Sequence, residues 1–539
     1  MSSAHRDAFA RESLPPIEQR PEFRFELPAL HYPDQLNAAD ALLDRHVREG
    51  RGDRRCILAP EVAWSYADLR DRANRIANVL VDDLGVVPGN RVLLRAPNTP
   101  MLAACWFAVV KAGAIAVTTM PLYRAGELRH MIEKAQIRHA LCDARIAEEL
   151  ATATDGAKVR TVLFGTGDTE LERLMAAASP AFENVATAAD DVALIGFTSG
   201  TTGAAKATMH YHRDLLAICD TYGARVLKAS PDDLFTGSPP LGFTFGLGGE
   251  LIFPLHIGAA TLMLEKAPPA ALLHAIGAFG VNVVFTAPIA YRAMTSMLAD
   301  ADISSLRLCV SAGETLPAPV WEAWHEATGL KILDGIGSTE MLHIFVGSSL
   351  EDARPGATGK VVPGYVAEIH DDDGNPLPLD EIGKIAVKGP TGCRYLSDER
   401  QGTYVRNGWN YPGDAYSLDA EGYFHYVART DDMIVSAGYN ISGPEVEQAL
   451  LAHAGVKECA VVAKADPAHG TNIVKAFVVR DDGAAIDADA LIAFCKGRIA
   501  PYKAPREIEF VDALPRTETG KVQRYKLRAR ADDAAPATG

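Results

Sequence analysis

The chain has 539 residues, more than the roughly 250 to 300 at which a single hydrophobic core stops growing, so the sequence predicts at least two domains. Hydrophobic residues make up 48% and charged residues 23% of the chain, which is ordinary for a soluble globular protein. The formal net charge of −16 argues against a general nucleic-acid or anionic-membrane surface. Anionic ligands would therefore have to be bound by local sites.

Cysteine usage and the N-terminus indicate where the chain works. The cysteines are scattered, without a CxxC pair or zinc-ligand spacing. The N-terminal stretch MSSAHRDAFARES is polar and lacks the hydrophobic core of a secretory signal. These features predict a reduced, cytoplasmic protein. The most apolar stretch, residues 101–120, is interrupted by Lys111 and Gly113, so we expect a buried helix running into a strand there and no membrane span.

Helical and strand patterns alternate along most of the chain. Strands are expected over 91–95, 114–118 and 139–142, with helices over 101–112 and 127–136 between them. The rhythm continues with strands over 233–236, 260–264, 282–286, 306–310 and 331–333, and helices over 213–227, 269–279, 288–299 and 317–328. Such βαβ alternation predicts an α/β fold in which helices cover parallel sheets.

The pattern of predicted elements changes after residue 350, where short β runs separated by turns suggest a small β lobe. A glycine- and charge-rich segment over 429–438 is interpreted as a hinge. Beyond it, helices over 444–452 and 487–499 and strands over 456–463, 474–479 and 508–510 predict a compact α+β domain. We therefore expect a large N-terminal domain over 1–430 and a small C-terminal domain over 431–539.

Residues 198–206 read TSGTTGAAK and follow an apolar strand pattern over 192–197. Glycines let the backbone approach a ligand closely, hydroxyls donate to phosphate oxygens, and a lysine adds positive charge. The stretch therefore predicts a polyphosphate-binding loop at the carboxyl end of a strand, although a flexible surface turn has a similar composition. It does not match the Walker pattern. Loops over 286–288, 311–314 and 334–340 follow other predicted strands and would converge on the same sheet edge.

Single residues outside this loop allow two interpretations each. Glu340 could hold Mg²⁺ or serve a helix N-terminus, and Asp414 could bind a ribose diol or sit in a plain turn. Lys521 follows a turn glycine, where a lysine is usually only solubilising. His210 and His212 are interpreted as site-wall or helix-start residues, because no third metal ligand is evident. A serine hydrolase has no support, because the chain lacks a G-x-S-x-G elbow.

Taken in order, the motifs resemble the adenylate-forming superfamily of acyl-CoA synthetases, luciferases and peptide-synthetase adenylation domains. The matches are TSGTTGAAK at 198–206, SAGE at 311–314, GSTE at 337–340, YPGD at 411–414, ARTDDMI at 428–434 and PRTETGK at 515–521. They cover the chain from about residue 37 to 530. Within the superfamily, DGIGSTEMLHIF at 334–345 is similar to benzoate-CoA ligases, while TMHYHRD at 208–214 and DDMIVSAGYNISGPEVE at 431–447 resemble the 2-aminobenzoate (anthranilate)-CoA ligase branch.

The resemblance implies a role for each matching position. ATP phosphates would be held by Thr198, Ser199, Gly200, Thr201, Thr202, Gly203 and Lys206. Thr339 and Glu340 would be catalytic residues together with Lys521, and Glu340 would bind Mg²⁺. Adenine would be lined by Gly313, Glu314 and Ile336, and the ribose would be held by Asp414 and Arg429.

The remaining implied roles concern the reaction and the acyl group. Lys521 would bridge the α-phosphate and the acyl carboxylate during adenylation, and Asp431 would be the hinge about which a mobile C-terminal domain rotates. Gly438 would then approach the pantetheine channel of CoA. The aromatic ring would be lined by Phe243, Thr244, Phe245, Gly337, His343 and Ile344.

Two positions depart from the family pattern. Ala205 replaces the proline usual in the phosphate loop, which should loosen the loop without removing a phosphate ligand. Val435 stands where many relatives, including benzoate-CoA ligases, carry a lysine near the substrate carboxylate, and its loss disfavours plain benzoate. We hypothesise that the smaller apolar residue suits a ring whose ortho amino group makes an internal hydrogen bond to the carboxylate.

The resemblance thus implies an acid-thiol ligase, namely an ATP-dependent aryl-CoA ligase. Its expected substrate is 2-aminobenzoate, with benzoate or a hydroxybenzoate as alternatives. ATP, Mg²⁺ and coenzyme A would be its cofactor and co-substrates. An enzyme that loads a carrier protein is a different class, which the lack of a fused carrier domain disfavours. A luciferase-like oxygenase has no support. We expect no nucleic-acid or membrane partner; the assembly state stays open, with a homodimer among the alternatives.

Overall fold

The computed structural model describes residues 3–165, 167–198, 205–430, 432–436, 439–466, 471–481, 483–484, 486–499, 501, 503–516 and 521–533. These residues fall into two compact units. The first unit holds the described residues up to Thr198 together with 205–367 and 387–410. The second unit holds residues 368–386 and the described residues from Tyr411 onward.

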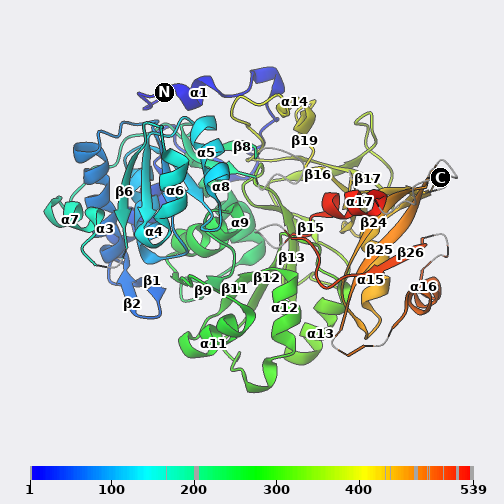
Figure 1. Cartoon of the computed structure of the whole chain (residues 1–539). Helices are drawn as coiled ribbons and strands as arrows, with labels where there is room; N and C mark the ends of the chain where they lie inside the picture. Colours follow the sequence, from blue (N-terminus) through cyan, green and yellow to red (C-terminus); the bar gives the residue numbers. More distant parts are fainter. Residues whose placement is uncertain are drawn as a thin grey trace. The chain divides into compact units, whose positions relative to one another are not determined.

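The first unit contains a six-stranded sheet that ends in the strands flanking the predicted phosphate loop (Figure 1). Its order is β6 (Arg160–Phe164), β5 (His139–Asp143), β3 (Arg91–Arg95), β4 (Ile115–Thr119), β7 (Val192–Phe197) and β8 (Ala207–Tyr211). All neighbours are parallel except β8, which returns antiparallel to β7. The predicted strands and the helices α4 (Pro100–Lys111) and α5 (Ala125–Lys134) are confirmed. Thr99 caps α4 by accepting from Leu102 N, and Pro100 suits its first turn.

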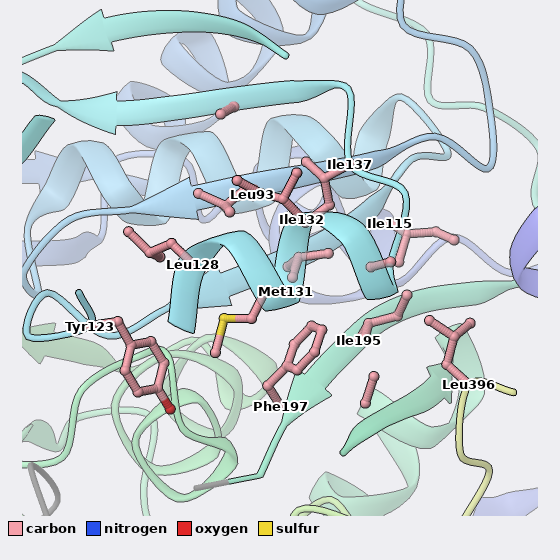
Figure 2. Close-up of a cluster of buried hydrophobic side chains, with 14 of the residues drawn as sticks. Leu93, Ile115, Tyr123, Leu128, Met131, Ile132, Ile137, Ile195, Phe197 and Leu396 are labelled. Carbon is pink, nitrogen blue, oxygen red and sulfur yellow. The ribbon is translucent and has the colours of Figure 1, made fainter. Parts of the chain in front are cut away.

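A hydrophobic cluster fixes the strand that leads into the phosphate loop. Leu128, Met131 and Ile132 of α5 follow helical spacing and are buried against the sheet. Figure 2 shows these side chains gathered with Ile195 and Phe197 of β7, as well as residues of β3 and β4. Burial on this scale stabilises by about 1.5–3 kcal/mol per large apolar side chain. The end of β7 is therefore anchored in the core, one residue before Thr198.

The first unit also contains a nine-stranded sheet that carries the other predicted loops. Its order is β15 (Lys360–Val361), β14 (Ile344–Gly347), β13 (Ile332–Gly337), β12 (Leu308–Ser311), β11 (Val283–Thr286), β9 (Leu234–Gly237), β10 (Ala260–Leu262), β1 (Arg55–Ala59) and β2 (Val62–Ser65). The strands from β13 to β1 run parallel. The predicted helices appear as α11 (Pro269–Phe279), α12 (Pro288–Thr295) and α13 (Ala318–Thr328).

The loop predicted over 334–340 is wrong in its first half. The strand continues to Gly337 and turns back as β14, which pairs antiparallel with it. Glycine is needed at this turn because a Cβ on Gly337 would lie 2.6 Å from the His343 carbonyl oxygen. The glycines therefore allow close strand pairing here, where composition alone suggested a loop.

The helix predicted over 213–227 is present but irregular. It begins as α8 (His212–Ile218) and continues as a π-helical segment, Cys219–Leu227. Strand β8 before it was not predicted. His212 is the first residue of α8, so its interpretation as a helix-start residue is confirmed, while His210 lies in β8 and its site-wall role stays a prediction.

The second unit contains short strands followed by a small α+β fold. Strand β17 (Gly383–Lys388) passes from this unit into the first, while β20 (Asp414–Leu418) and β21 (Phe424–Arg429) form an antiparallel pair. Beyond them lie β22 (Ile434–Ser436), β23 (Tyr439–Ile441), α15 (Gly443–Leu451), β24 (Val456–Asp466), β25 (Thr471–Arg480), α16 (Ala488–Lys496), β26 (Glu507–Phe510) and α17 (Arg524–Asp533). The predicted α+β element order is confirmed. The boundary at 430/431 stays a prediction, because Asp431 lies outside the described residues.

In the part of the chain that the structure describes, no helix is both long and apolar enough to cross a membrane.

Candidate functional site

The described ends of the phosphate loop are tied to each other. The backbone N–H of Thr198 donates to the Lys206 carbonyl oxygen over 2.9 Å, and the Lys206 N–H donates to Thr198 Oγ1 over 3.2 Å. His130 Nε2 donates to the Ala205 carbonyl oxygen over 3.0 Å. Ser199, Gly200, Thr201, Thr202 and Gly203 lie outside the described residues. The hairpin thus fixes where the loop begins and ends.

Glu340 lies on the turn between β13 and β14, together with Thr339 and His343. Its side chain is only 8% exposed, and its Oε1 lies 3.7 Å from Lys206 Nζ. The Tyr395 hydroxyl donates to the same oxygen over 2.5 Å. Burial, with the Glu340 charge adding to it, raises the pKa of Tyr395, so the phenol stays protonated and donates. The structure thus brings together Lys206 and Glu340, two residues that the sequence motifs singled out separately.

Contacts behind the turn hold Thr339 and Glu340 in place. His210 Nε2 donates to the Thr339 carbonyl oxygen over 2.8 Å. A Cβ on Gly196 of β7 would lie 2.9 Å from Thr339 Cγ2, so the turn packs directly on that strand. Leu342 adopts φ of 71° and is fully buried, a conformation that a non-glycine residue holds only when its surroundings impose it. The turn is therefore held from several sides.

His343 lies at the centre of an aromatic cluster. Its ring centroid lies 4.6 Å from that of Phe253, 5.8 Å from Phe245 and 5.5 Å from Tyr222. Phe285 joins the cluster at 5.5 Å from Phe245. Burial lowers the pKa of His343 to about 3, with the nearby Phe245 backbone acting in the opposite direction, so the imidazole is neutral. Among the described residues neither ring nitrogen meets a partner with hydrogen-bond geometry.

Two glycines make room for this cluster. A Cβ on Gly248 would lie 2.7 Å from His343 Nε2, and one on Gly249 would lie 2.6 Å from Phe285 Cγ. Both glycines belong to a π-helical segment, Gly248–Ile252, that follows α9 (Thr244–Leu247). The other predicted ring-lining residues lie on neighbouring elements of the chain: Phe243 and Thr244 at the start of α9, Gly337 at the end of β13 and Ile344 at the start of β14.

The residues predicted to line adenine lie at the ends of neighbouring strands. Gly313 and Glu314 follow β12, and Ile336 lies near the end of β13, which is paired with β12. Gly313 adopts φ of 91°, a left-handed conformation that glycine accepts without strain. Asp334, on the same strand as Ile336, is buried, and burial raises its pKa to about 8. Its carboxyl group is therefore mostly protonated at neutral pH.

The second unit carries the remaining predicted residues. Asp414 and Arg429 are directly paired across β20 and β21, with Arg429 Nη1 3.2 Å from Asp414 Oδ2. Arg429 Nη1 also donates to the Pro412 carbonyl oxygen over 3.0 Å. Lys521 is exposed at the surface of this unit, before α17. Val435 lies in β22, while Asp431 and Gly438 lie outside the described residues.

Several residues near the candidate site were not predicted from the sequence. Phe253, Phe285 and Tyr395 belong to none of the motifs, although Phe285 is the next-to-last residue of a predicted strand that leads into one of the predicted loops. Gly248 and Gly249 were visible only as part of a glycine-rich run. Among the described residues, no group of three or more His, Cys, Asp or Glu side chains could hold a metal ion. A single carboxylate such as Glu340 fits Mg²⁺, which takes one or two carboxylates together with phosphate oxygens.

The fold is α/β, with the predicted nucleotide-binding residues at strand ends, and comparison with known proteins identifies the class of enzyme. The model of the AMP-binding enzyme family matches residues 43–395, and the model of its C-terminal domain matches residues 445–521. The chain belongs to the AMP-binding enzyme family, whose members form acyl-adenylates. The predicted membership of the adenylate-forming superfamily and the predicted α/β fold are confirmed.

Individual relatives indicate which kind of ligase within this family the chain is similar to. The chain is 36% identical to a benzoate–CoA ligase of Thauera aromatica in an alignment of 520 positions that covers 93% of this chain and 97% of that protein. It is similar to the crystal structure of an anthranilate CoA ligase in complex with anthranoyl-AMP, with a TM-score of 0.88, 33% identity and coverage of 94% of this chain and 99% of the other. A benzoate CoA ligase from Burkholderia xenovorans gives a TM-score of 0.84 and 32% identity over 92% of this chain and 100% of the other. The predicted benzoate-CoA ligase group and acid-thiol ligase class are confirmed.

Proposed function

We propose that this aryl-CoA ligase uses 2-aminobenzoate as its preferred acid, converting it through an acyl-adenylate to the CoA thioester with release of AMP and pyrophosphate. The main support for the proposal is the position of the turn between β13 and β14. It presents Glu340 to Lys206 on one side and His343 to the aromatic cluster on the other. A ligand with its ring among Phe245, Phe253 and Phe285 would thus have its carboxylate close to the phosphate side of the site.

The neutral His343 favours a ring that carries a hydrogen-bonding substituent. A neutral imidazole offers one donor and one acceptor, and a buried polar group left unpaired costs about 1–3 kcal/mol. An amino group can pair with a ring nitrogen, whereas plain benzoate cannot. The anthranilate CoA ligase noted above, crystallised with anthranoyl-AMP, has a similar chain, which supports this choice.

The phosphates of ATP would be bound by Thr198, Lys206 and the loop between them. Glu340, beside Thr339, would hold Mg²⁺, which supplies charge to offset the phosphates when it is bound. Gly313, Glu314 and Ile336 would line the adenine, while Asp414 and Arg429 would hold the ribose hydroxyls. Each group has a chemistry that suits its ligand: carboxylates accept from hydroxyls, and cations attract phosphate oxygens.

The reaction needs these residues because a carboxylate is a poor electrophile. Its oxygen attacks the α-phosphorus of ATP, the bond to pyrophosphate breaks, and the mixed anhydride carries AMP as a good leaving group. Lys521 would offset the negative charge that gathers at the α-phosphate. The CoA thiol then attacks the acyl carbon, loses its proton and displaces AMP. A C-terminal domain over 431–539, hinged at Asp431, would rotate between the steps and bring Gly438 to the pantetheine channel.

Benzoate or a hydroxybenzoate is the second candidate, because the Thauera aromatica and Burkholderia xenovorans relatives are named benzoate CoA ligases. Carrier-protein loading is a separate alternative for the acceptor. Each acid gives its own thioester, and each acceptor gives a different thioester product, so one assay compares all the alternatives.

Thioester formation and AMP release are measured with benzoate, 2-aminobenzoate, the hydroxybenzoates and medium-chain fatty acids, with free CoA or a carrier protein as acceptor. We expect 2-aminobenzoate with free CoA to give the highest kcat/KM. A higher value for benzoate would overturn the substrate, and fatty acids ahead of every aromatic acid would overturn the ring pocket. Transfer to the carrier protein alone would overturn the acceptor.

A further inference from the structure

Tyr395 lies beside both charged side chains on the phosphate side of the site. Its hydroxyl donates to Glu340 Oε1 over 2.5 Å, and its ring centroid lies 4.9 Å from Lys206 Nζ. Lys206 Nζ lies 3.7 Å from the same Glu340 oxygen. One phenol therefore contacts a carboxylate through its hydroxyl and an ammonium group through its ring.

The backbone around Tyr395 is joined to the strand that leaves the phosphate loop. Met209 N–H of β8 donates to the Arg394 carbonyl oxygen, and Leu396 N–H donates to the Ala207 carbonyl oxygen, each over 2.8 Å. Tyr395 itself forms an antiparallel bridge with Thr208. Residues 394–396 thus pair with β8 as a short additional strand. Lys206 is the residue directly before β8, so this pairing lies next to it.

A buried ion pair anchors this segment from behind. Arg394 and Asp214 of α8 are both fully buried, and Arg394 Nη1 donates to Asp214 Oδ2 over 3.0 Å. The Arg394 guanidinium also lies 3.9 Å from the ring centroid of Tyr211. Burial raises the pKa of Asp214, but the Arg394 charge, with smaller contributions from His210 and Arg213, holds it below its usual range, so the pair stays ionised near neutral pH. Tyr395 is therefore carried on a segment that has little freedom to move.

We propose that Tyr395 is a positioning residue for magnesium–ATP: it fixes the Glu340 carboxylate and keeps Lys206 beside it in one arrangement before the nucleotide binds. The proposal rests on the proposed roles of Glu340 and Lys206 in ATP binding. Groups held in place in advance need no reorganisation when their ligand arrives, and this raises affinity.

The physical reason is competition for one carboxylate oxygen. Without the phenol hydroxyl, Glu340 Oε1 would lose its hydrogen bond and would attract Lys206 more closely. Attraction between opposite charges is strong where water is largely excluded. The ammonium group would close on the carboxylate, and magnesium–ATP would have to separate the pair. Metal-free ATP would also draw Lys206 from the pair, but it does not need the carboxylate as a metal ligand, so its binding should depend less on Tyr395.

The test is nucleotide binding to Tyr395→Phe, measured by titration calorimetry without acid or CoA, so that no turnover occurs. The dissociation constant of magnesium–ATP should rise about tenfold, the size of one hydrogen bond to a charged group, while that of metal-free ATP should change less than about twofold. A purely structural role would weaken both equally. Equal weakening, or no change in either constant, overturns the proposal.

A matched control loses a buried phenol hydroxyl elsewhere in the first unit. Tyr66 is fully buried and donates to the Ala259 carbonyl oxygen over 2.7 Å, so Tyr66→Phe loses the same kind of hydrogen bond. It should leave both nucleotide constants unchanged. Should Tyr395→Phe not fold, Tyr395→His supplies a ring N–H donor in place of the hydroxyl. It should keep the magnesium–ATP constant closer to wild type than Tyr395→Leu does, and the opposite order overturns the proposal.

A double-mutant cycle tests whether Tyr395 acts through Glu340. In the background of Glu340→Gln, Tyr395→Phe should weaken magnesium–ATP binding less than about twofold further, because the carboxylate that it positions is gone. Full addition of the two losses overturns the proposal. Thioester formation by the wild type is measured in parallel. Its absence would count against the proposed function, while the binding constants would still decide the role of Tyr395.

Discussion

The two units carry their parts of the proposed site in different ways. In the first unit, Lys206, Glu340 and Tyr395 contact one another, and the rings around His343 are packed together. In the second unit, Lys521 is exposed at the surface. Under the proposed roles, the first unit would hold the phosphates of ATP and the aromatic acid with groups held in advance, while the second unit would supply the ribose partners and the lysine of one reaction step. Binding and activation should therefore be separable by mutation.

Removal of Lys521 should give the largest effect. We expect Lys521→Ala to slow adenylation by about 100- to 1,000-fold, because one charge that offsets the transition state is lost. Thioester formation from supplied 2-aminobenzoyl-AMP should stay within about threefold of wild type. Single-turnover assays of each half-reaction measure this. Lys526→Ala, which removes another exposed lysine of the second unit, is the control. Equal loss of both half-reactions would contradict the separation.

Removal of the ribose partner should affect nucleotide binding alone. Asp414→Ala removes a buried carboxylate and the partner of Arg429, so the KM for ATP should rise about 10- to 100-fold, as expected for hydrogen bonds to a charged group. The KM for the aromatic acid should not change. Asp419→Ala, which removes a carboxylate bonded to His425 in the same unit, serves as control. A rise in the KM for the acid with that for ATP unchanged would refute the ribose role.

Filling the space beside His343 should affect the acid alone. The Cβ of Gly248→Ala would lie 2.7 Å from His343 Nε2, so the ring must shift. Such overpacking costs about 1–3 kcal/mol, and we expect kcat/KM for 2-aminobenzoate to fall about tenfold. The dissociation constant of ATP should remain unchanged. Gly126→Ala, where a Cβ has no neighbour within 4 Å, is the matched control. Unaltered kinetics with every aromatic acid would place the ring elsewhere.

Titration of Asp334 should give the smallest effect. Its folded pKa is raised to about 8, whereas the unfolded chain loses this proton near the ordinary value of 3.8. The group therefore contributes stability that is complete below about pH 4 and is lost as pH rises toward 8. Asp334→Asn cannot titrate, so its Tm relative to wild type should rise by about 1–3 °C between pH 5.5 and 8. Calorimetric scans at both pH values measure this. A Tm difference that is the same at both would show that Asp334 ionises normally.

The sequence predicted the elements whose signals are local. Helix α11 and the strands β11 and β12 follow from hydrophobic runs bounded by Pro and Gly, and the ligand-binding motifs lie at strand ends. The strand pairing of β13 with β14 could not be predicted in the same way, because Gly335 and Gly337 have no strand propensity and pair only through packing against residues 343–344. Tyr395 was also missed, since its contacts join segments far apart in the chain.

The proposed reaction is tested most directly by rapid mixing of the wild-type enzyme with 2-aminobenzoate, ATP and Mg²⁺ in the absence of CoA, followed by acid quenching. We expect 2-aminobenzoyl-AMP to accumulate to about one equivalent per active site, with matching release of pyrophosphate. CoA added afterwards should convert it to the thioester with release of AMP. Thioester formation without any detectable adenylate, or an adenylate that CoA does not consume, would rule out the proposed two-step reaction.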